Sequence, residues 1–279
     1  MITEIENVKI EENRINFDFL NNVELKTENE KSKIWDAGKT LVAISHTHGK
    51  VSSEFDLCGK KIIDWVRLAS SCCEQVLIDV DEDNILATLR KVVENDVYEK
   101  FEYVAFLYGD TPLLQKTTFV DIMNRFANSG LNVMKLTRGF VFRADYLKTA
   151  RILLETNVDN LGKEEFFVVD NAQAISIAFK ILNGRILDYH KQNGVVFFGE
   201  DTIFVDADVE IEAGTVVYPN NILKGESYIG KSVILESGNY ILDTIVCDEC
   251  FICQSYLEKS KIESGRVVGP FAKIVNQKI

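Results

Sequence analysis

Aliphatic residues recur at a constant step of six in the last third of the chain. They are Val205, Ile211, Val217, Leu223, Ile229, Leu235 and Ile241. A small or β-branched residue follows each of them four positions later, at Val209, Thr215, Asn221, Ser227, Val233, Asn239 and Ile245. Neither a helix nor an ordinary strand has this period. A repeat of six with one aliphatic residue per short strand predicts a parallel β-helix, in which three strands complete one coil.

The repeat continues with one interruption. The step shortens to five between Ile241 and Val246 and then runs through Ile252, Leu257, Ile262, Val268 and Ile274. This length predicts about four coils. A short β-helix has two open ends and long flat faces, so we expect self-association and a neighbouring domain that covers one end.

Buried strands and helices alternate in the middle of the chain. We expect strands at residues 41–44, 75–78 and 103–107, and helices at residues 60–71 and 85–93. Such a series predicts a mostly parallel sheet with helices on both faces. In sheets of this kind ligands bind at the carboxyl ends of the strands.

The pattern after residue 115 adds further elements. We expect a helix at 117–129 that ends at Gly130, strands at 133–136 and 140–142, a helix at 146–155, and a long helix from Ala172 that ends at Asn193-Gly194. Residues 1–35 alternate only weakly and indicate a short hairpin or arm.

These elements predict four segments. They are an N-terminal arm at residues 1–35, an α/β domain at 36–170, a linker helix at 171–198 and a β-helix at 199–279.

Composition narrows the functional classes. The 279 residues are 46% hydrophobic, enough for two domains with real cores, and carry a net charge of −12. The acidic balance disfavours nucleic acid as a partner. No apolar run is long enough to span a membrane, and no signal peptide is visible at the N-terminus, so a soluble, cytoplasmic protein without membrane contact is expected. Six cysteines are too few for a disulfide scaffold and indicate reduced thiols.

Three segments of the β-helix resemble a known family. They are residues 205–211, Val217-Tyr218-Pro219-Asn220, and Val267-Val268-Gly269-Pro270-Phe271-Ala272. They are similar to coils of the bifunctional UDP-N-acetylglucosamine pyrophosphorylase and glucosamine-1-phosphate N-acetyltransferase family, in register over about 70 residues. The resemblance implies a Rossmann-like nucleotidyltransferase sheet domain, a left-handed β-helix with hexapeptide repeats, and a homotrimer.

The segment from Tyr108 to Leu114 resembles the family's Gly-Asp motif at the end of a strand. The resemblance implies that Asp110 binds Mg²⁺ and that Tyr108, Gly109 and Thr111 contact the substrate. A hard oxygen ligand suits this chemistry because Mg²⁺ offsets the charge of the reacting phosphates. The alternative is that Asp110 caps the helix that follows.

The segment ending in Val169-Asp170-Asn171 resembles the family's second magnesium-binding segment. The resemblance implies that Asp170, with Asn171 beside it, completes the metal site. The alternative is that Asp170 caps the helix beginning at Ala172.

The chain also departs from the family. The stretch at residues 43–51 replaces the family's glycine-rich phosphate loop, and it keeps one glycine and no arginine. Lys50 or Lys60 is the candidate for catalytic phosphate binding. The base-reading segments have no counterpart between residues 81 and 100, and the acetyltransferase residues of the family lie beyond the coil at 269–272, so acetyl transfer is not expected.

Two other sets of residues have metal-like spacing. We expect His46-x-His48 to be solvated, because no third ligand is nearby. We expect Cys247, Cys250 and Cys253 to pack in the β-helix, because Cys250 falls on a small inward position and a cluster would need a fourth thiolate.

Two functional hypotheses follow. The first is a sugar-1-phosphate nucleotidyltransferase with nucleotide and sugar phosphate as substrates, weakened by the loss of the glycine-rich loop. The second is a non-catalytic oligomeric scaffold or nucleotide-sensing relative of the full-length synthase, because most groups that would hold the transition state are missing.

Overall fold

The computed structural model describes residues 34–279, except residues 48, 50, 81–84, 95–99 and 151–157. The contacts divide the described chain into two compact units, one ending at Leu182 and the other beginning at Asn183. The arm expected at residues 1–35 lies outside the described residues, except for its last two positions. Among the helices described, none has the length and apolar character needed to cross a membrane.

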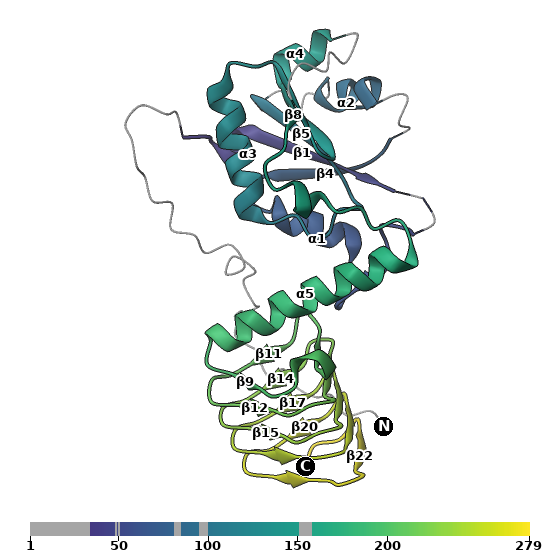
Figure 1. The fold of residues 1–279 in the computed structure, drawn as a ribbon, viewed down its shortest axis with the longest axis vertical. Coiled ribbons are helices and arrows are strands. Elements are labelled where there is room, and N and C mark those ends of the chain that lie inside the picture. The colour runs from purple at the N-terminus through teal and green to yellow at the C-terminus, as the bar shows by residue number, and fades with distance from the viewer. Residues whose placement is uncertain (1–33, 48, 50, 81–84, 95–99, 151–157) are drawn as a thin grey trace. The chain divides into compact units, whose positions relative to one another are not determined.

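The first unit contains a six-stranded mixed sheet (Figure 1). Its strands, in spatial order, are β4 (Glu74–Asp79), β1 (Thr40–His46), β5 (Tyr103–Tyr108), β7 (Gly139–Arg143), β6 (Val133–Leu136) and β8 (Val158–Asp159). β1 is parallel to β4 and β5, whereas β7 is antiparallel to both β5 and β6. The sheet is therefore less parallel than expected, because a two-residue turn joins β6 directly to β7.

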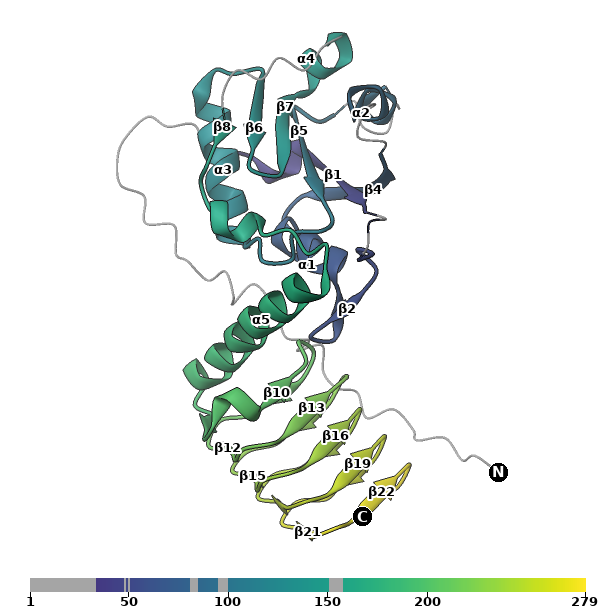
Figure 2. The ribbon, with the colours of Figure 1, turned by 45° about the vertical axis from the view of Figure 1, so that its right-hand side comes forward.

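Helices cover both faces of this sheet (Figure 2). α1 (Ile62–Ala69) and α3 (Lys116–Ser129) pack on one face with Val42 and Ala105, and α2 (Ile85–Val93) and α4 (Ala144–Thr149) pack on the other with Ala43 and Phe106. α1 begins after a small hairpin formed by β2 (Asp56–Leu57) and β3 (Lys60–Lys61). The doubly covered sheet confirms the α/β prediction.

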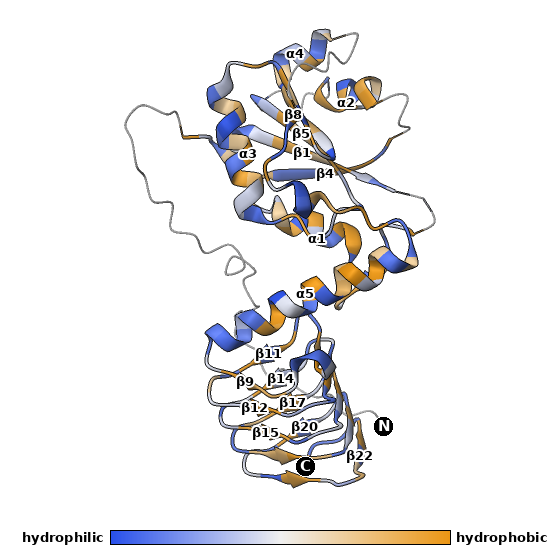
Figure 3. Cartoon of the chain, in the orientation of Figure 1, coloured by the Kyte–Doolittle hydropathy of each residue, from blue (hydrophilic) through white to orange (hydrophobic). Residues whose placement is uncertain are grey.

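Two of the expected helix ends are visible in the backbone. α3 ends at Gly130, which has φ of 69°, as glycine allows at a left-handed helix end. α5 (Ala172–Gln192) ends before Gly194, which has φ of 89°. Orange and blue alternate along α5 in Figure 3, as expected for a helix with one buried side.

The second unit is a left-handed parallel β-helix made of three stacked sheets. The first sheet has β10 (Phe204–Val205), β13 (Ile222–Lys224), β16 (Tyr240–Leu242), β19 (Tyr256–Glu258) and β22 (Lys273–Val275). The second has β11 (Glu210–Ile211), β14 (Tyr228–Ile229), β17 (Ile245–Val246) and β20 (Lys261–Ile262). The third has β9 (Val196–Phe197), β12 (Val216–Val217), β15 (Ile234–Leu235), β18 (Phe251–Ile252) and β21 (Val267–Val268).

The predicted aliphatic column is present in this β-helix. Val205 is in register with Leu223, and Leu223 with Ile241, so each aliphatic residue lies on its copy one coil away. The end of α5 closes the first coil: the Asn183 side-chain amide donates to the Ile203 carbonyl at 2.9 Å, and its oxygen accepts from the Val205 amide at 3.0 Å. Asn183 therefore satisfies two backbone polar groups of the first coil where it meets the helix end.

The small inward positions carry buried, hydrogen-bonded side chains. Asn221 and Asn239 are fully buried, and the side-chain nitrogen of Asn239 donates to the Asn221 side-chain oxygen at 2.9 Å. One expected inward residue was wrong: Thr244 is fully buried, whereas Ile245 is half-buried. The step of five removes a residue from that corner, so the inward position moves back by one.

Candidate functional site

The carboxyl ends of β1 and β5 meet at Gly109. The Gly109 amide donates to the Ser45 carbonyl at 2.9 Å, and a Cβ atom at Gly109 would lie 2.7 Å from the same oxygen. Only glycine permits this close approach. The next residue, Asp110, is consequently fixed at the edge of the sheet where ligands of α/β proteins bind.

Asp110 forms a two-point contact with Arg138. The Arg138 Nη2 and Nε atoms donate to the two carboxylate oxygens of Asp110, at 2.6 Å and 3.3 Å. The Asp110 side chain is 8% exposed and that of Arg138 is 28% exposed. The guanidinium also lies over the Tyr108 ring, 3.8 Å from its centroid. A bidentate, partly buried pair of this kind is stronger and more directional than a surface ion pair.

A tight turn places Arg138 beside Asp110. β6 and β7 pair from Leu136 opposite Gly139, so Thr137 and Arg138 form a two-residue hairpin loop. Gly139 has φ of 133°, and a Cβ atom there would lie 2.3 Å from the Phe106 carbonyl. The glycine allows β7 to lie against β5, and the turn then faces the residues that follow β5.

Arg138 is the functional candidate that sequence reasoning missed. Arg138-Gly139 lies between two predicted strands, and nothing in the local pattern distinguishes it from an ordinary turn. The signal would have been the strand order. Once β7 is known to be antiparallel to β5, its first residues must lie at the carboxyl end of β5.

The segment before α5 also reaches Asp110. The Val169 amide donates to the Asp110 carbonyl at 2.9 Å, so Asp170 follows a residue that is bonded to Asp110. Asp170 is exposed, and its carboxylate accepts from the side-chain nitrogen of Asn171 at 2.6 Å. Asn171, and not Asp170, caps α5, because its side-chain oxygen accepts from the Ala174 amide at 3.0 Å.

The groups expected to hold magnesium are engaged with protein partners in this arrangement. Both carboxylate oxygens of Asp110 already accept from a guanidinium, and the side-chain oxygen of Asn171 is engaged in the helix cap. Over the described residues, no group of three or more His, Cys, Asp or Glu side chains is arranged to hold a metal ion. The roles expected for Asp110, Asp170 and Asn171 as metal ligands stay predictions.

The stretch after β1 is bonded to itself. The Thr47 amide donates to the Ser53 hydroxyl at 3.1 Å, the Ser53 amide to the Thr47 carbonyl at 3.2 Å, and the Phe55 amide to the Ser52 carbonyl at 2.9 Å. A phosphate cradle needs such amides to converge on the ligand. In this stretch these three donate within the loop instead.

The charged side chains around this stretch form their own network. Glu54 bonds to Lys61 and lies 3.3 Å from the His46 Nδ1 atom. The hydrogen bond from Lys61 lowers the pKa of Glu54, so Glu54 is a carboxylate at neutral pH. Lys50 and His48 lie outside the described residues, and Lys60 is half-buried in the β2–β3 hairpin.

The remaining candidate, Thr111, serves the fold. It is fully buried, and its hydroxyl donates to the Tyr108 carbonyl at 3.2 Å. Of the residues expected to contact substrate, Tyr108 alone presents a half-buried side chain at the sheet edge. The substrate contacts of Tyr108, Gly109 and Thr111 stay predictions.

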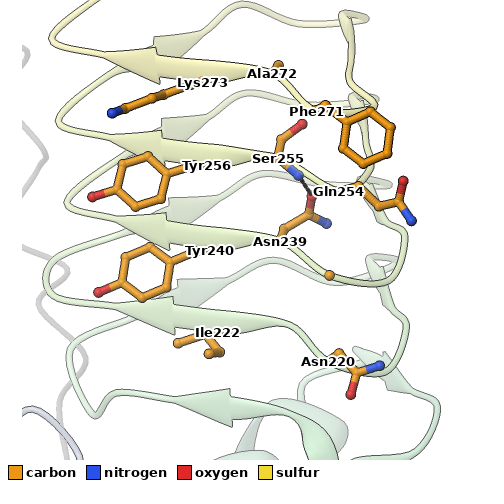
Figure 4. Close-up of a pocket in the computed structure, with 11 residues that line it drawn as sticks. Asn220, Ile222, Asn239, Tyr240, Gln254, Ser255, Tyr256, Phe271, Ala272 and Lys273 are labelled. Atoms are coloured by element: carbon orange, nitrogen blue, oxygen red, sulfur yellow. Dashed lines mark hydrogen bonds between the residues drawn. The ribbon is translucent and has the colours of Figure 1, made fainter.

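A second concave surface lies on the β-helix (Figure 4). This groove, about 440 Å³ in volume, runs beside the stacked rings of Tyr240 and Tyr256, whose centroids are 5.2 Å apart. Gln254 and Phe271 line its corner, and Lys273 lies at the last coil. All six cysteines are free of disulfide bonds, and Cys250 is buried at an inward position as expected.

The fold defines the class: an α/β, Rossmann-like sheet unit followed by a left-handed parallel β-helix. No protein-family model matches the chain. The bifunctional protein GlmU of Streptococcus agalactiae is 38% identical over 111 residues, which cover 40% of this chain and 24% of that protein. GlmU of Streptococcus thermophilus is 30% identical over 187 residues, which cover 66% of this chain and 39% of that protein.

A clostridial protein agrees with these matches. GlmU of Clostridium botulinum is 34% identical over 134 residues, which cover 46% of this chain and 30% of that protein. The chain is thus a partial and divergent relative of the GlmU proteins, as the resemblance predicted. The match spans between about a quarter and two fifths of the length of these relatives.

Proposed function

We propose that this chain is a sugar-1-phosphate nucleotidyltransferase-like protein of the UDP-N-acetylglucosamine pyrophosphorylase type, in which nucleotidyl transfer is strongly weakened and binding of a sugar nucleotide is retained. The observation that carries the proposal is the bidentate Asp110–Arg138 pair at the carboxyl end of β5. Sequence similarity to GlmU supports the class of ligand.

The chemistry explains why transfer would be weak. Attack on a nucleotide phosphate needs preorganised positive charge and amide donors at the phosphates that react. Here the charge of Arg138 is offset by Asp110, and amides of the loop after β1 donate within that loop. Ligand binding needs less, because it does not require stabilisation of a transition state.

Two measurements on the full chain test this proposal. Both tryptophans, Trp35 and Trp65, lie in the sheet unit, so tryptophan fluorescence reports the unfolding of that unit alone. UDP-N-acetylglucosamine at a hundred times its Kd should stabilise this unit by about 2.7 kcal/mol. Pyrophosphate release from UTP and N-acetylglucosamine 1-phosphate should stay near the background rate. Turnover at the rate of a full-length synthase would contradict weakened transfer. If no nucleotide raised the stability of the sheet unit, the proposal that a sugar nucleotide binds would be wrong.

The β-helix favours a second role as an oligomeric scaffold. Its last coil exposes two apolar side chains, Val267 at 75% and Phe271 at 83%. Exposed apolar residues on a flat, repetitive face are typical of a subunit contact. A homotrimer in the cytoplasm, where the six thiols stay reduced, is the assembly we propose. Sedimentation should give three copies for the wild type and fewer for Phe271→Asp; a wild-type monomer would exclude this role.

A further inference from the structure

We infer that Arg138 takes the place of a divalent cation at Asp110, and that removing its guanidinium would open a cation site there. The inference begins with charge. A buried carboxylate needs a compensating cation, which can be either a metal ion or a positively charged side chain. Asp110 is 6% exposed as a residue, and the cation that it contacts is Arg138.

The contact uses the oxygen atoms that a metal ion would need. Arg138 donates to both Oδ1 and Oδ2 of Asp110. The guanidinium takes one acceptor position on each oxygen and places its positive charge beside the carboxylate, so a metal cation at the same oxygens would be repelled by it. The planar fork matches a carboxylate at two points, whereas lysine would supply a single charge.

Three features hold the guanidinium in place. The two-residue turn fixes its backbone, the close packing of Gly139 on Phe106 fixes the turn, and the Tyr108 ring lies 3.8 Å below the guanidinium carbon. The ring attracts the cation on one face while the carboxylate binds its edge. Arg138 is therefore built into the sheet edge and is not a mobile surface side chain.

A second acidic residue follows a segment that is bonded to Asp110. The Val169 amide donates to the Asp110 carbonyl at 2.9 Å, so the backbone of Asp170, the next residue, lies at the same edge of the sheet. Oxygen atoms from carboxylates and carbonyls are the ligands that Mg²⁺ and Mn²⁺ prefer. Loss of the guanidinium would remove the cation that is paired with the buried Asp110 carboxylate among the residues that the structure describes.

The test measures Mn²⁺ binding to the full chain by electron paramagnetic resonance, without any nucleotide. Arg138→Met keeps an unbranched apolar side chain over Tyr108 and removes the charge. We expect Mn²⁺ affinity to rise at least about tenfold in Arg138→Met, and to return to the wild-type value in Arg138→Met with Asp110→Asn. Arg138→Lys, which keeps a positive charge, should show no gain.

A matched control is available in the same unit. Arg125 pairs with Asp159 at 3.7 Å, with 61% and 12% of the two side chains exposed. Arg125→Met should leave Mn²⁺ binding unchanged, because this contact is longer than that of Arg138 with Asp110 and its arginine is mostly exposed to solvent. Tryptophan fluorescence establishes that each variant is folded. Equal Mn²⁺ affinity of folded Arg138→Met and wild type would overturn the inference.

A second experiment keeps Arg138 unchanged and therefore does not depend on the stability of any Arg138 variant. If Arg138 replaces the cation, Asp110→Asn should not lower Mn²⁺ binding in an otherwise unchanged chain. A loss of Mn²⁺ binding in that variant would show that Asp110 holds a metal despite Arg138, and would overturn the inference.

A last experiment, which rests on the proposed function, measures how Mg²⁺ changes the affinity for UDP. UDP should bind the wild type with the same affinity in EDTA and in Mg²⁺, and Arg138→Met should bind UDP more tightly in Mg²⁺ than in EDTA. UDP affinity that depends on Mg²⁺ in the wild type would contradict the inference. No UDP binding in either condition would contradict the proposed function, while the Mn²⁺ measurements would still decide the role of Arg138.

Discussion

Buried polar side chains are used differently in the two units. In the β-helix the same contact recurs from coil to coil: the backbone amide of Asn239 donates to the Asn221 side-chain oxygen, and the backbone amide of Ser255 donates to the Asn239 side-chain oxygen. In the sheet unit, Asp110 and Arg138 form one contact between residues 28 positions apart, through a turn that occurs once. A repeated contact can lose one member and keep its neighbours, whereas a single contact depends on every element that positions it.

The largest effect should come from the glycine that positions Arg138. Gly139→Ala introduces a Cβ atom 2.3 Å from the Phe106 carbonyl at a φ of 133°, so β7 must move away from β5. We expect the sheet unit to lose about 4 kcal/mol of unfolding free energy, as measured by urea denaturation with tryptophan fluorescence.

Gly130→Ala is the matched control for this substitution. Gly130 has φ of 69° but no atom within 4 Å of its Cβ position, so the cost should be about 1 kcal/mol from backbone strain alone. Equal losses in the two variants would show that close packing at Gly139 does not fix the turn.

The next effect concerns a buried histidine in the β-helix unit. His190 is 2% exposed, and neither ring nitrogen has a partner in ordinary hydrogen-bond geometry, although a weaker contact with the Val209 backbone favours the charged ring. Burial lowers the pKa of His190 from 6.5 to about 4. As the pH falls below 6.5 the unfolded chain gains a proton that the folded chain does not bind until about pH 4, so stability is lost across that window.

The size of this effect is about 3 kcal/mol between neutral pH and pH 4. Hydrogen exchange in residues 199–279 measures it, because tryptophan fluorescence does not report this unit. His190→Leu should remove most of the pH dependence relative to the wild type. An unchanged dependence in that variant would assign it to the carboxylates instead.

The polar ladder should be less sensitive than the glycine turn. Asn239→Ala removes the acceptor of the Ser255 amide and a donor to Asn221, leaving buried groups without partners. We expect a loss of about 2 kcal/mol, seen as faster hydrogen exchange in the adjacent coils. Gln254→Ala, at an exposed corner of the same sheet, should change little. Comparable increases in hydrogen exchange in both variants would show that the buried asparagines stabilise the β-helix no more than the exposed corner residues do.

The period of six was sufficient to predict the β-helix. The aliphatic column was right because each strand contributes one residue to it, whatever the corners do. The inward position at Ile245 was wrong because the shortened step moved it to Thr244. The pattern of the α/β unit likewise predicted most of its helices and strands, but neither β8 nor the antiparallel direction of β7. The helix expected at 146–155 was too long, because α4 ends at Thr149 and the backbone of Ala150 is extended.

The candidate site was predictable only in part. A motif at the end of a strand indicated Asp110 as the position to examine, because strand ends converge in such sheets. Its partner could not be foreseen, since Arg138 reaches Asp110 through a strand order that local sequence does not encode. The cap at Asn171 shows the same limit. Asp170 and Asn171 can both accept a hydrogen bond at the start of α5, and the local sequence does not determine which of them does so.

The smallest effect should come from an exposed ion pair. Lys191 lies 2.8 Å from Asp188 and 2.9 Å from Glu200, and the hydrogen bond to Asp188 is the main cause that raises the pKa of Lys191. The side chains of Lys191 and Glu200 are 37% and 44% exposed, so solvent screens the contact. Lys191→Met should cost less than about 1 kcal/mol, and the loss should vanish at high salt in hydrogen-exchange measurements. A larger loss of stability that did not depend on salt would mean that solvent exposure does not weaken this pair relative to the Asp110–Arg138 pair, in which water is largely excluded from the carboxylate.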